Sequence, residues 1–146
     1  GLRFFTVYGS WTRPDMAAYK FMSAIDQGKL ITLYNEGQVF RDFTHVSDIV
    51  QSIQLLIAKV KQEKPGTHQV FNIGYGQPIS VKKYATIIAN NLEKKLKFNT
   101  APLPINELES THSDCSRLEQ YIGFKPQCEA EEGIKEMVAW YKAFKY

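Results

Sequence analysis

The stretch QVFRDFTHVSDIV, Gln38–Val50, sets an arginine inside an extended, apolar run. Phe40 and Phe43 suit the half-buried surface of a short strand. From Asp48 onward the apolar residues follow helical spacing, so the segment predicts a strand that leads directly into a helix. An arginine flanked by aromatic residues in extended backbone is held in place. Arg41 therefore either pairs with another residue of the protein or contacts a ligand.

The segments before this stretch predict alternating strands and helices. Residues 2–8 form a continuous apolar run, which favours a strand buried on both faces. Asp15 is the expected N-cap of a helix over residues 16–27 that stops at Gly28. The run LITLY at residues 30–34 is followed by NEG and then by residues 38–43, which predicts a β-hairpin.

The segments after it continue the alternation. The helix that follows Arg41 is expected to span residues 47–60, with its apolar residues on one stripe. Residues 69–74 and 95–99 predict two more short strands. Ser80 and Asp114 are expected to cap helices that end near Leu92 and Gly123, and a final amphipathic helix surrounds residues 134–141. The pattern as a whole predicts a mixed α/β chain with small, separated strand pairs.

The length and composition are those of one globular domain. The chain has 146 residues, 44% of them hydrophobic and 13% aromatic, and a net charge of 18 − 15 = +3. Its two cysteines, Cys115 and Cys128, indicate neither a disulfide framework nor a zinc site. No apolar run is long enough to span a bilayer, and no stretch has the pattern of a signal peptide. We therefore expect no membrane association and a cytoplasmic location.

Several motif-like patterns are better explained as structure. The glycines of GYG, residues 74–76, follow a predicted strand, but the third glycine of a dinucleotide-binding loop is replaced by Ile79. Ser47 and Asp48 lie at a predicted helix start, which favours capping over a catalytic triad with His45. The tyrosine-x-x-x-lysine pairs Tyr121/Lys125 and Tyr141/Lys145 are expected to be chance matches. No set of catalytic residues follows from these patterns.

Lysines gather in two places, near residues 59–64 and 94–97. Each group ends a predicted helix, where positive charge complements the helix dipole. Neither group alternates with aromatic residues as stacking on bases would require. We therefore expect a solvated surface and no binding of nucleic acid.

Five blocks of the sequence together resemble a known family. They are LRFFTVYGSWTRPDMA (2–17), GQVFRDFTHVSDI (37–49), FNIG (71–74), STHSD (110–114) and IGFKP (122–126). Their order and content resemble the extended short-chain dehydrogenase/reductase family of NAD-dependent sugar-nucleotide epimerases and dehydratases, and within it the UDP-glucuronate 4-epimerases.

The resemblance implies that residues 1–146 are the C-terminal, substrate-binding portion of a Rossmann-type α/β enzyme. This portion would be a small mixed α/β domain with a late strand of the Rossmann sheet. The glycine-rich NAD loop and the catalytic tyrosine and lysine of the family would lie before Gly1. The full enzyme, expected to be a homodimer, would interconvert UDP-glucuronate and UDP-galacturonate by transient oxidation at C4. The chain alone would catalyse nothing.

The resemblance also assigns roles to five residues. Arg41 matches the arginine that holds the UDP phosphates, while Thr6 and Arg13 match the pair that holds the sugar carboxylate. Tyr34 falls where the family packs against uracil, and Asn72 falls where some relatives contact the nucleotide.

Purely structural roles remain open for two of these residues. Arg41 can instead pair with Asp42 or Glu36, and Tyr34 can belong to the core. The chain also departs from the family in a loop that helps close over the diphosphate, where relatives have Pro-Gly-Asp and this sequence has Pro104-Ile105-Asn106-Glu107. The alternative functions are a UDP-sugar dehydratase or decarboxylase of the same family and a non-catalytic nucleotide-sugar-binding domain.

Overall fold

The computed structural model describes residues 1–144 and alternates short strands with helices. The helices are α1 (Ala17–Asp26), η1 (a 3₁₀ turn, Asn35–Gly37), α2 (Val46–Val60), α3 (Val81–Leu92), α4 (Ser116–Ile122) and α5 (Ala130–Phe144). The strands are β1 (Leu2–Phe4), β2 (Thr6–Tyr8), β3 (Ile31–Tyr34), β4 (Phe40–Arg41), β5 (Phe43–His45), β6 (Phe71–Ile73), β7 (Ile79–Ser80) and β8 (Phe98–Ala101). No helix among these residues is long and apolar enough to cross a membrane.

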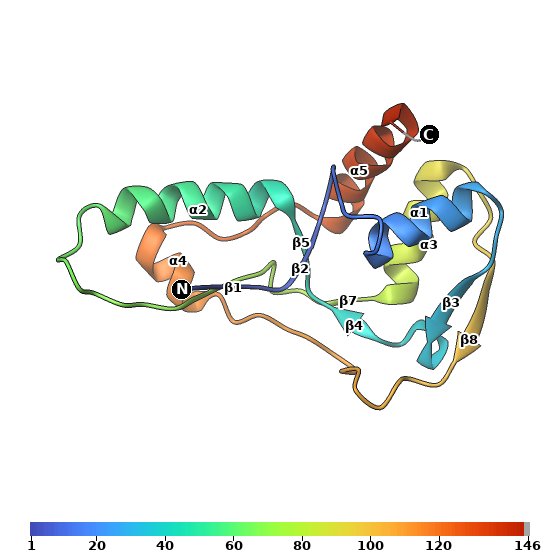
Figure 1. Cartoon of the computed structure of the whole chain (residues 1–146), viewed down its shortest axis with the longest axis horizontal. Coiled ribbons are helices and arrows are strands. Elements are labelled where there is room, and N and C mark those ends of the chain that lie inside the picture. The colour runs from blue at the N-terminus through green and yellow to red at the C-terminus, as the bar shows by residue number, and fades with distance from the viewer. Residues whose placement is uncertain (145–146) are drawn as a thin grey trace.

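The molecule is elongated and has two lobes joined by strands (Figure 1). The smaller lobe contains α2, α4, β1 and β6, and its core is built from Ile49, Leu56, Phe71, Ile73 and Leu118. The larger lobe contains α1, α3, α5, β3 and β8, and α3 packs against both α1 and α5. The strands β2, β4, β5 and β7 lie between the lobes in Figure 1.

The prediction of small, separated strand pairs is confirmed, because the described strands form four two-stranded sheets. β1 pairs with β6, β2 with β5 and β3 with β8, all in parallel, while β4 and β7 are antiparallel. The predicted hairpin over residues 30–43 is wrong. Residues 35–37 have φ angles of +48°, +56° and +81°, and the chain leaves this left-handed turn toward β7 instead of folding back onto β3.

The strand predicted over residues 2–8 is also partly wrong. It is broken at Phe5 into β1 and β2, and all three residues of β1 are exposed. Leu2 and Phe4 keep 39% and 47% of their surface accessible. Parallel sheets normally have both faces and both neighbours covered. Within residues 1–144, however, β1 pairs only with β6.

Aromatic packing fixes the strands that carry the candidate site to the larger lobe. Phe43 of β5 stacks on Tyr84 of α3, with ring centroids 3.9 Å apart and ring planes 8° from parallel. Tyr8 of β2 meets both rings edge-on. Such stacked and edge-on arrangements suit the charge distribution of aromatic rings. The segment Arg41–Asp42 is therefore continuous with a strand that the core holds rigidly.

The helix positions follow the sequence prediction, but several caps do not. Ser80 caps α3 as expected by accepting a hydrogen bond from the Lys83 backbone. Asp15 does not cap α1, since Met16 is the N-cap residue and the Asp15 carboxylate pairs with Arg13. Asp114 lies one residue before the N-cap of α4, where it accepts a hydrogen bond from the Ser116 amide.

The capping prediction for Ser47 and Asp48 is wrong, because both side chains bond to residues outside the first turn of α2. Ser47 Oγ lies 2.8 Å from His45 Nδ1. Asp48 is buried, and its Oδ2 accepts hydrogen bonds from the Gln127 and Cys128 amides. Asp48 thus fastens α2 to the segment that leads into α5.

Candidate functional site

Arg41 lies on β4 with only 16% of its side chain exposed. Its Nη1 donates to the Phe40 carbonyl at 2.9 Å, and its Nη2 donates to Glu107 Oε2 at 3.0 Å. The alternative that Arg41 pairs with Asp42 or Glu36 is therefore wrong. Its carboxylate partner comes from the loop that departs from the family pattern, 66 residues later in the chain.

The segment that follows this loop runs along β4. The Phe40 amide donates to the Glu109 carbonyl at 2.8 Å, and the Thr111 amide donates to the Phe40 carbonyl at 3.1 Å. β4 is therefore held on one side by β7 and on the other by residues 109–111. This support fixes the backbone from which the Arg41 side chain projects.

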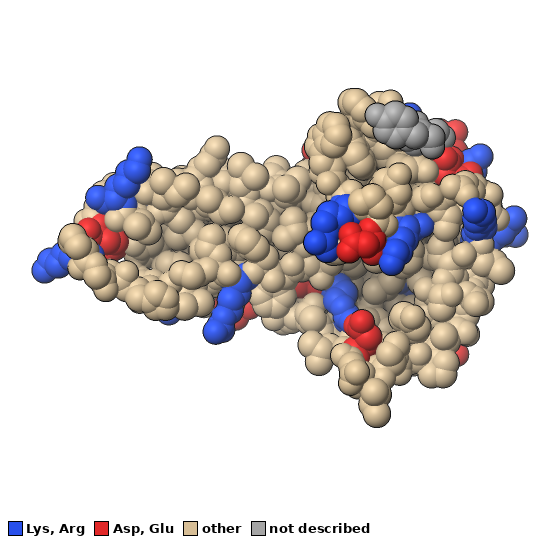
Figure 2. Space-filling model, viewed as in Figure 1, with Lys and Arg blue, Asp and Glu red and all other residues tan. Residues whose placement is uncertain are grey.

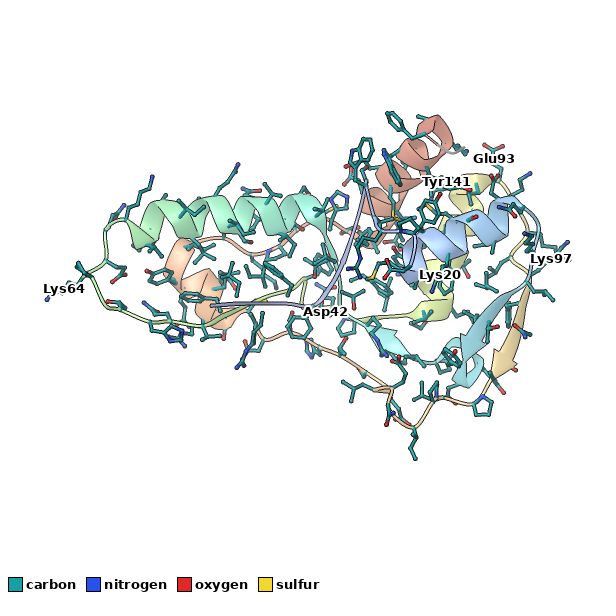
Figure 3. All side chains as sticks on the ribbon, in the orientation of Figure 1. Lys20, Asp42, Lys64, Glu93, Lys97 and Tyr141 are labelled. Carbon is teal, nitrogen blue, oxygen red and sulfur yellow. The ribbon has the colours of Figure 1, made fainter. Side chains whose placement is uncertain are left out.

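Asp42 is completely buried where the two lobes meet (Figure 3). Its two carboxylate oxygens accept hydrogen bonds from the backbone amides of Tyr75, Gly76 and Ser113 and from the Ser113 hydroxyl. A buried carboxylate is stable only when its oxygens are satisfied in this way. Asp42 consequently ties β4 to the turn after β6 and to the segment before α4.

These contacts decide whether the GYG turn fits NAD. A dinucleotide loop presents free backbone amides to the pyrophosphate at the start of a helix. Here the amides of Tyr75 and Gly76 are bonded to Asp42, and a Cβ added at Gly74 would lie 2.3 Å from Ser113 Oγ. The glycine at position 74 makes room for Ser113, and the turn is followed by β7. This turn therefore does not fit an NAD phosphate.

Thr6 and Tyr34 lie on different strands, β2 and β3. Thr6 faces Phe43 across the β2–β5 pair, and its amide donates to the Asp42 carbonyl at 3.1 Å. Tyr34 ends β3 directly before the left-handed turn, opposite Ala101. With 43% of its surface exposed, Tyr34 is not a core residue, so that alternative is wrong.

The loop after β8 connects the strand beside Tyr34 to the Arg41 side chain. The loop of residues 102–108 leaves β8 beside Tyr34 and carries Glu107 to Arg41. In Figure 1 this loop is the orange segment below β4 and β3, and the surface above it is recessed in Figure 2. Basic and acidic side chains lie at the edge of the recess.

Arg13 lies in the loop between β2 and α1, with 73% of its side chain exposed. Its Nη2 pairs with Asp15 Oδ2 at 3.2 Å. It borders a shallow cavity of about 240 Å³ that Tyr8, Trp11 and Val46 also line. Neither Thr6 nor Arg41 lines this cavity, so the described residues do not gather all the predicted contacts into one pocket.

Asn72 has a structural partner. Its Nδ2 donates to the Asp114 carbonyl at 3.1 Å, which joins β6 to the start of α4. The remaining N–H and the side-chain oxygen of Asn72 are the groups that a ligand could use.

The acidic residues on which the site depends are not evident from the sequence pattern. The pattern presents Asp42 only as a neighbour of Arg41, whereas its carboxylate holds three backbone segments together. Glu107 stands out in the sequence only as a departure from the family. A carboxylate in a polar loop gives no local signal of its partner when that partner lies 66 residues away.

Burial shifts the pKa values of two ionisable side chains, Tyr8 and Cys128. Burial, reinforced by the Asp48 charge, raises the pKa of Tyr8 well above its ordinary value. Burial, with Asp48 nearby, raises the pKa of the Cys128 thiol to about 11. Neither group is suited to act as a base or as a nucleophile. Among residues 1–144 no cluster of His, Cys, Asp and Glu could hold a metal ion.

Comparison with known proteins places this geometry in a family. Residues 1–74 match the model of the NAD dependent epimerase/dehydratase family. UDP-glucuronate 4-epimerase 5 of Arabidopsis thaliana is 38% identical over 156 residues, covering 99% of this chain and 36% of that protein.

Two solved structures have the same fold. MoeE5 in complex with UDP-glucuronic acid and NAD superposes with a TM-score of 0.86 and 30% identity, over 97% of this chain and 46% of that one. The UDP-glucuronic acid 4-epimerase of Bacillus cereus gives a TM-score of 0.86 and 25% identity, over 97% and 44%. The chain spans less than half the length of these proteins. The agreement of sequence and fold shows that the chain belongs to the NAD dependent epimerase/dehydratase family.

Proposed function

We propose that this chain is the C-terminal, substrate-binding portion of a nucleotide-sugar 4-epimerase that interconverts UDP-glucuronate and UDP-galacturonate. The observation that carries the proposal is Arg41, a guanidinium whose side chain is only 16% exposed on a strand that is paired on both sides. Two relatives named as UDP-glucuronate 4-epimerases, one of them as probable, match 99% and 95% of this chain at 38% and 36% identity.

Arg41 is proposed to hold the diphosphate. A guanidinium has five N–H donors, and the bond to the Phe40 carbonyl uses only one of them, so the others can serve phosphate oxygens. The planar donor fork matches two oxygens of a phosphate at once. Because β4 is paired on both sides, the guanidinium is already positioned before the ligand arrives.

Thr6 and Arg13 are proposed to hold the sugar carboxylate. The exposed ion pair between Arg13 and Asp15 contributes about 0.2–1 kcal/mol at most, so a ligand carboxylate can replace Asp15 at little cost. Tyr34 is proposed to pack against uracil, and Asn72 to contact the nucleotide with the groups that Asp114 leaves free.

NAD is proposed to bind outside the described residues, since the GYG turn does not fit it. The exposed β1 supports this division, because a parallel strand with exposed faces is suited to extend a larger sheet. Residues 1–146 would then form the substrate-binding domain of a longer, homodimeric enzyme. NAD would supply the hydride chemistry, while this chain binds and orients the UDP-sugar.

The first expected result concerns the chain by itself. Incubated with NAD and UDP-glucuronate, it should produce no UDP-galacturonate, because the amides of its glycine turn are occupied by Asp42. Product would be measured by chromatography of the nucleotide sugars. The full-length polypeptide that carries this sequence serves as the positive control. Turnover by the chain alone would contradict the proposed division of labour.

The second expected result separates glucuronate from neutral sugars. In the full-length polypeptide, Arg13→Ala should lower kcat/KM for UDP-glucuronate by about ten- to a hundredfold and leave UDP affinity nearly unchanged. The reason is that a ligand carboxylate would lose its charged partner, whereas the diphosphate would not. Arg13→Lys should rescue little, because an ammonium cannot form the two-pronged contact.

The control is the same pair of measurements with UDP-glucose as substrate, which has no carboxylate. Arg117→Ala, which removes an exposed arginine on α4, controls for the change in net charge. If Arg13→Ala lowers kcat/KM equally for both sugars, Arg13 supports the loop and does not recognise the acid.

A further inference from the structure

Arg41 cannot remain without a counter-charge when no ligand is bound. Most of its side chain is removed from solvent, and a guanidinium cannot lose its proton to avoid the cost of burial. Buried charges in proteins are accordingly paired. In the structure that partner is Glu107, whose Oε2 lies 3.0 Å from Arg41 Nη2.

The Glu107 carboxylate can move away from Arg41 without disturbing the surrounding structure. More than half of its side chain, 54%, is exposed, so its carboxylate can turn into water without losing packing. It lies in the 102–108 loop, whose neighbours Ile105 and Leu108 are 99% and 65% exposed. The backbone beyond the loop is fixed separately by the bond between Phe40 and Glu109, so moving the Glu107 side chain leaves β4 paired.

A diphosphate and the Glu107 carboxylate compete for the same guanidinium. Both are anionic, and both are suited to accept a hydrogen bond from Arg41 Nη2, which now donates to Glu107. If Glu107 stayed in place, like charges would lie within a few ångströms in a partly desolvated site, which disfavours binding. A diphosphate brings its own counter-charge to Arg41, so Glu107 is no longer needed there.

We propose that Glu107 is the exchangeable counter-ion of Arg41: it neutralises the guanidinium in the empty site and is displaced by the diphosphate on binding. The inference rests on the proposed role of Arg41 in holding the phosphates. Glu107 would thus lower the affinity of the site for the diphosphate and raise the stability of the protein when no diphosphate is bound.

Glu107→Gln tests the exchange, because it predicts two effects of opposite sign. The free protein should unfold at a lower temperature, since Arg41 loses its ionic partner. UDP should bind about two- to fivefold more tightly, since it no longer displaces an ionised carboxylate. Calorimetric titration with UDP and thermal unfolding of the ligand-free protein measure the two effects on the same sample.

Glu109→Gln is the matched control. It makes the same change of charge two residues away on an exposed side chain, while the backbone contact to Phe40 is kept. It should leave both UDP affinity and thermal unfolding unchanged. If it tightens UDP as much as Glu107→Gln does, the effect is one of general charge and the exchange is overturned.

A double variant separates this inference from the proposed function. In an Arg41→Ala background, Glu107→Gln should no longer increase the affinity for UDP, because the side chain at position 107 then has no guanidinium partner. Weaker or unchanged UDP binding by the single Glu107→Gln variant would overturn the exchange and leave Arg41 as a phosphate contact. Unchanged UDP affinity of the Arg41→Ala variant would instead overturn the proposed function itself.

Discussion

Asp42→Asn should lower the free energy of unfolding by about 2–4 kcal/mol, a large share of the stability of an ordinary domain. Asp42 Oδ2 accepts bonds from the Gly76 amide, the Ser113 amide and the Ser113 hydroxyl. An asparagine that keeps its oxygen at the Oδ1 position sets an NH₂ group against these donors. The amide donors of Gly76 and Ser113 would lose their acceptor beside a side chain that is completely buried.

Urea denaturation followed by far-ultraviolet circular dichroism measures this loss. Asp15→Asn is the matched control, because it neutralises an exposed carboxylate and should change the free energy of unfolding by less than about 0.5 kcal/mol. Ser113→Ala removes a single donor to Asp42 and should fall between the two variants. Equal stability of Asp42→Asn and the unsubstituted protein would mean that the three segments are held together by other contacts.

Arg41→Ala should weaken UDP binding by about one to two decades, which corresponds to about 1.5–3 kcal/mol for a lost charge-assisted hydrogen bond. The loss should appear with UDP alone, because the proposed contact is to the diphosphate and not to the sugar. The variant also leaves Glu107 without its ionic partner, but that side chain is largely exposed and readily hydrated. The expected change is thus mainly one of affinity.

Arg117→Ala is the comparison for Arg41→Ala. Arg117 is an exposed arginine of α4 that packs over Phe71 and bonds to Gln69. Its removal makes the same change in net charge in the smaller lobe and should leave UDP affinity unchanged. Equal weakening by both variants would point to a general electrostatic attraction.

The sequence predicts the helices of this fold better than its strand pairs. The helices α2 and α3 have apolar residues at regular helical spacing, and Ser80 marks where α3 begins. The strands are two to four residues long, and a run of that length carries no information about its partner. Local pattern therefore favours a hairpin between β3 and residues 38–43, whereas Ile31 of β3 lies opposite Phe98 of β8.

The same limit applies to the candidate site. That Arg41 is fixed in extended backbone follows from Phe40 and Phe43, which flank it in sequence. Its pairing with Glu107 and the burial of Asp42 among three backbone segments depend on how distant parts of the chain meet. Such contacts leave no local pattern in the sequence. For this reason Asp48 is predicted to cap α2, whereas in the structure its carboxylate bonds to the amides of residues 127 and 128.

The central claim is that this chain holds the diphosphate of a nucleotide sugar through Arg41. A crystal structure of the protein with UDP bound tests it most directly. We expect a phosphate oxygen within about 3 Å of the Arg41 guanidinium and the Glu107 carboxylate turned away from it. A structure in which UDP is bound elsewhere, with Arg41 still bonded to Glu107, would contradict the account.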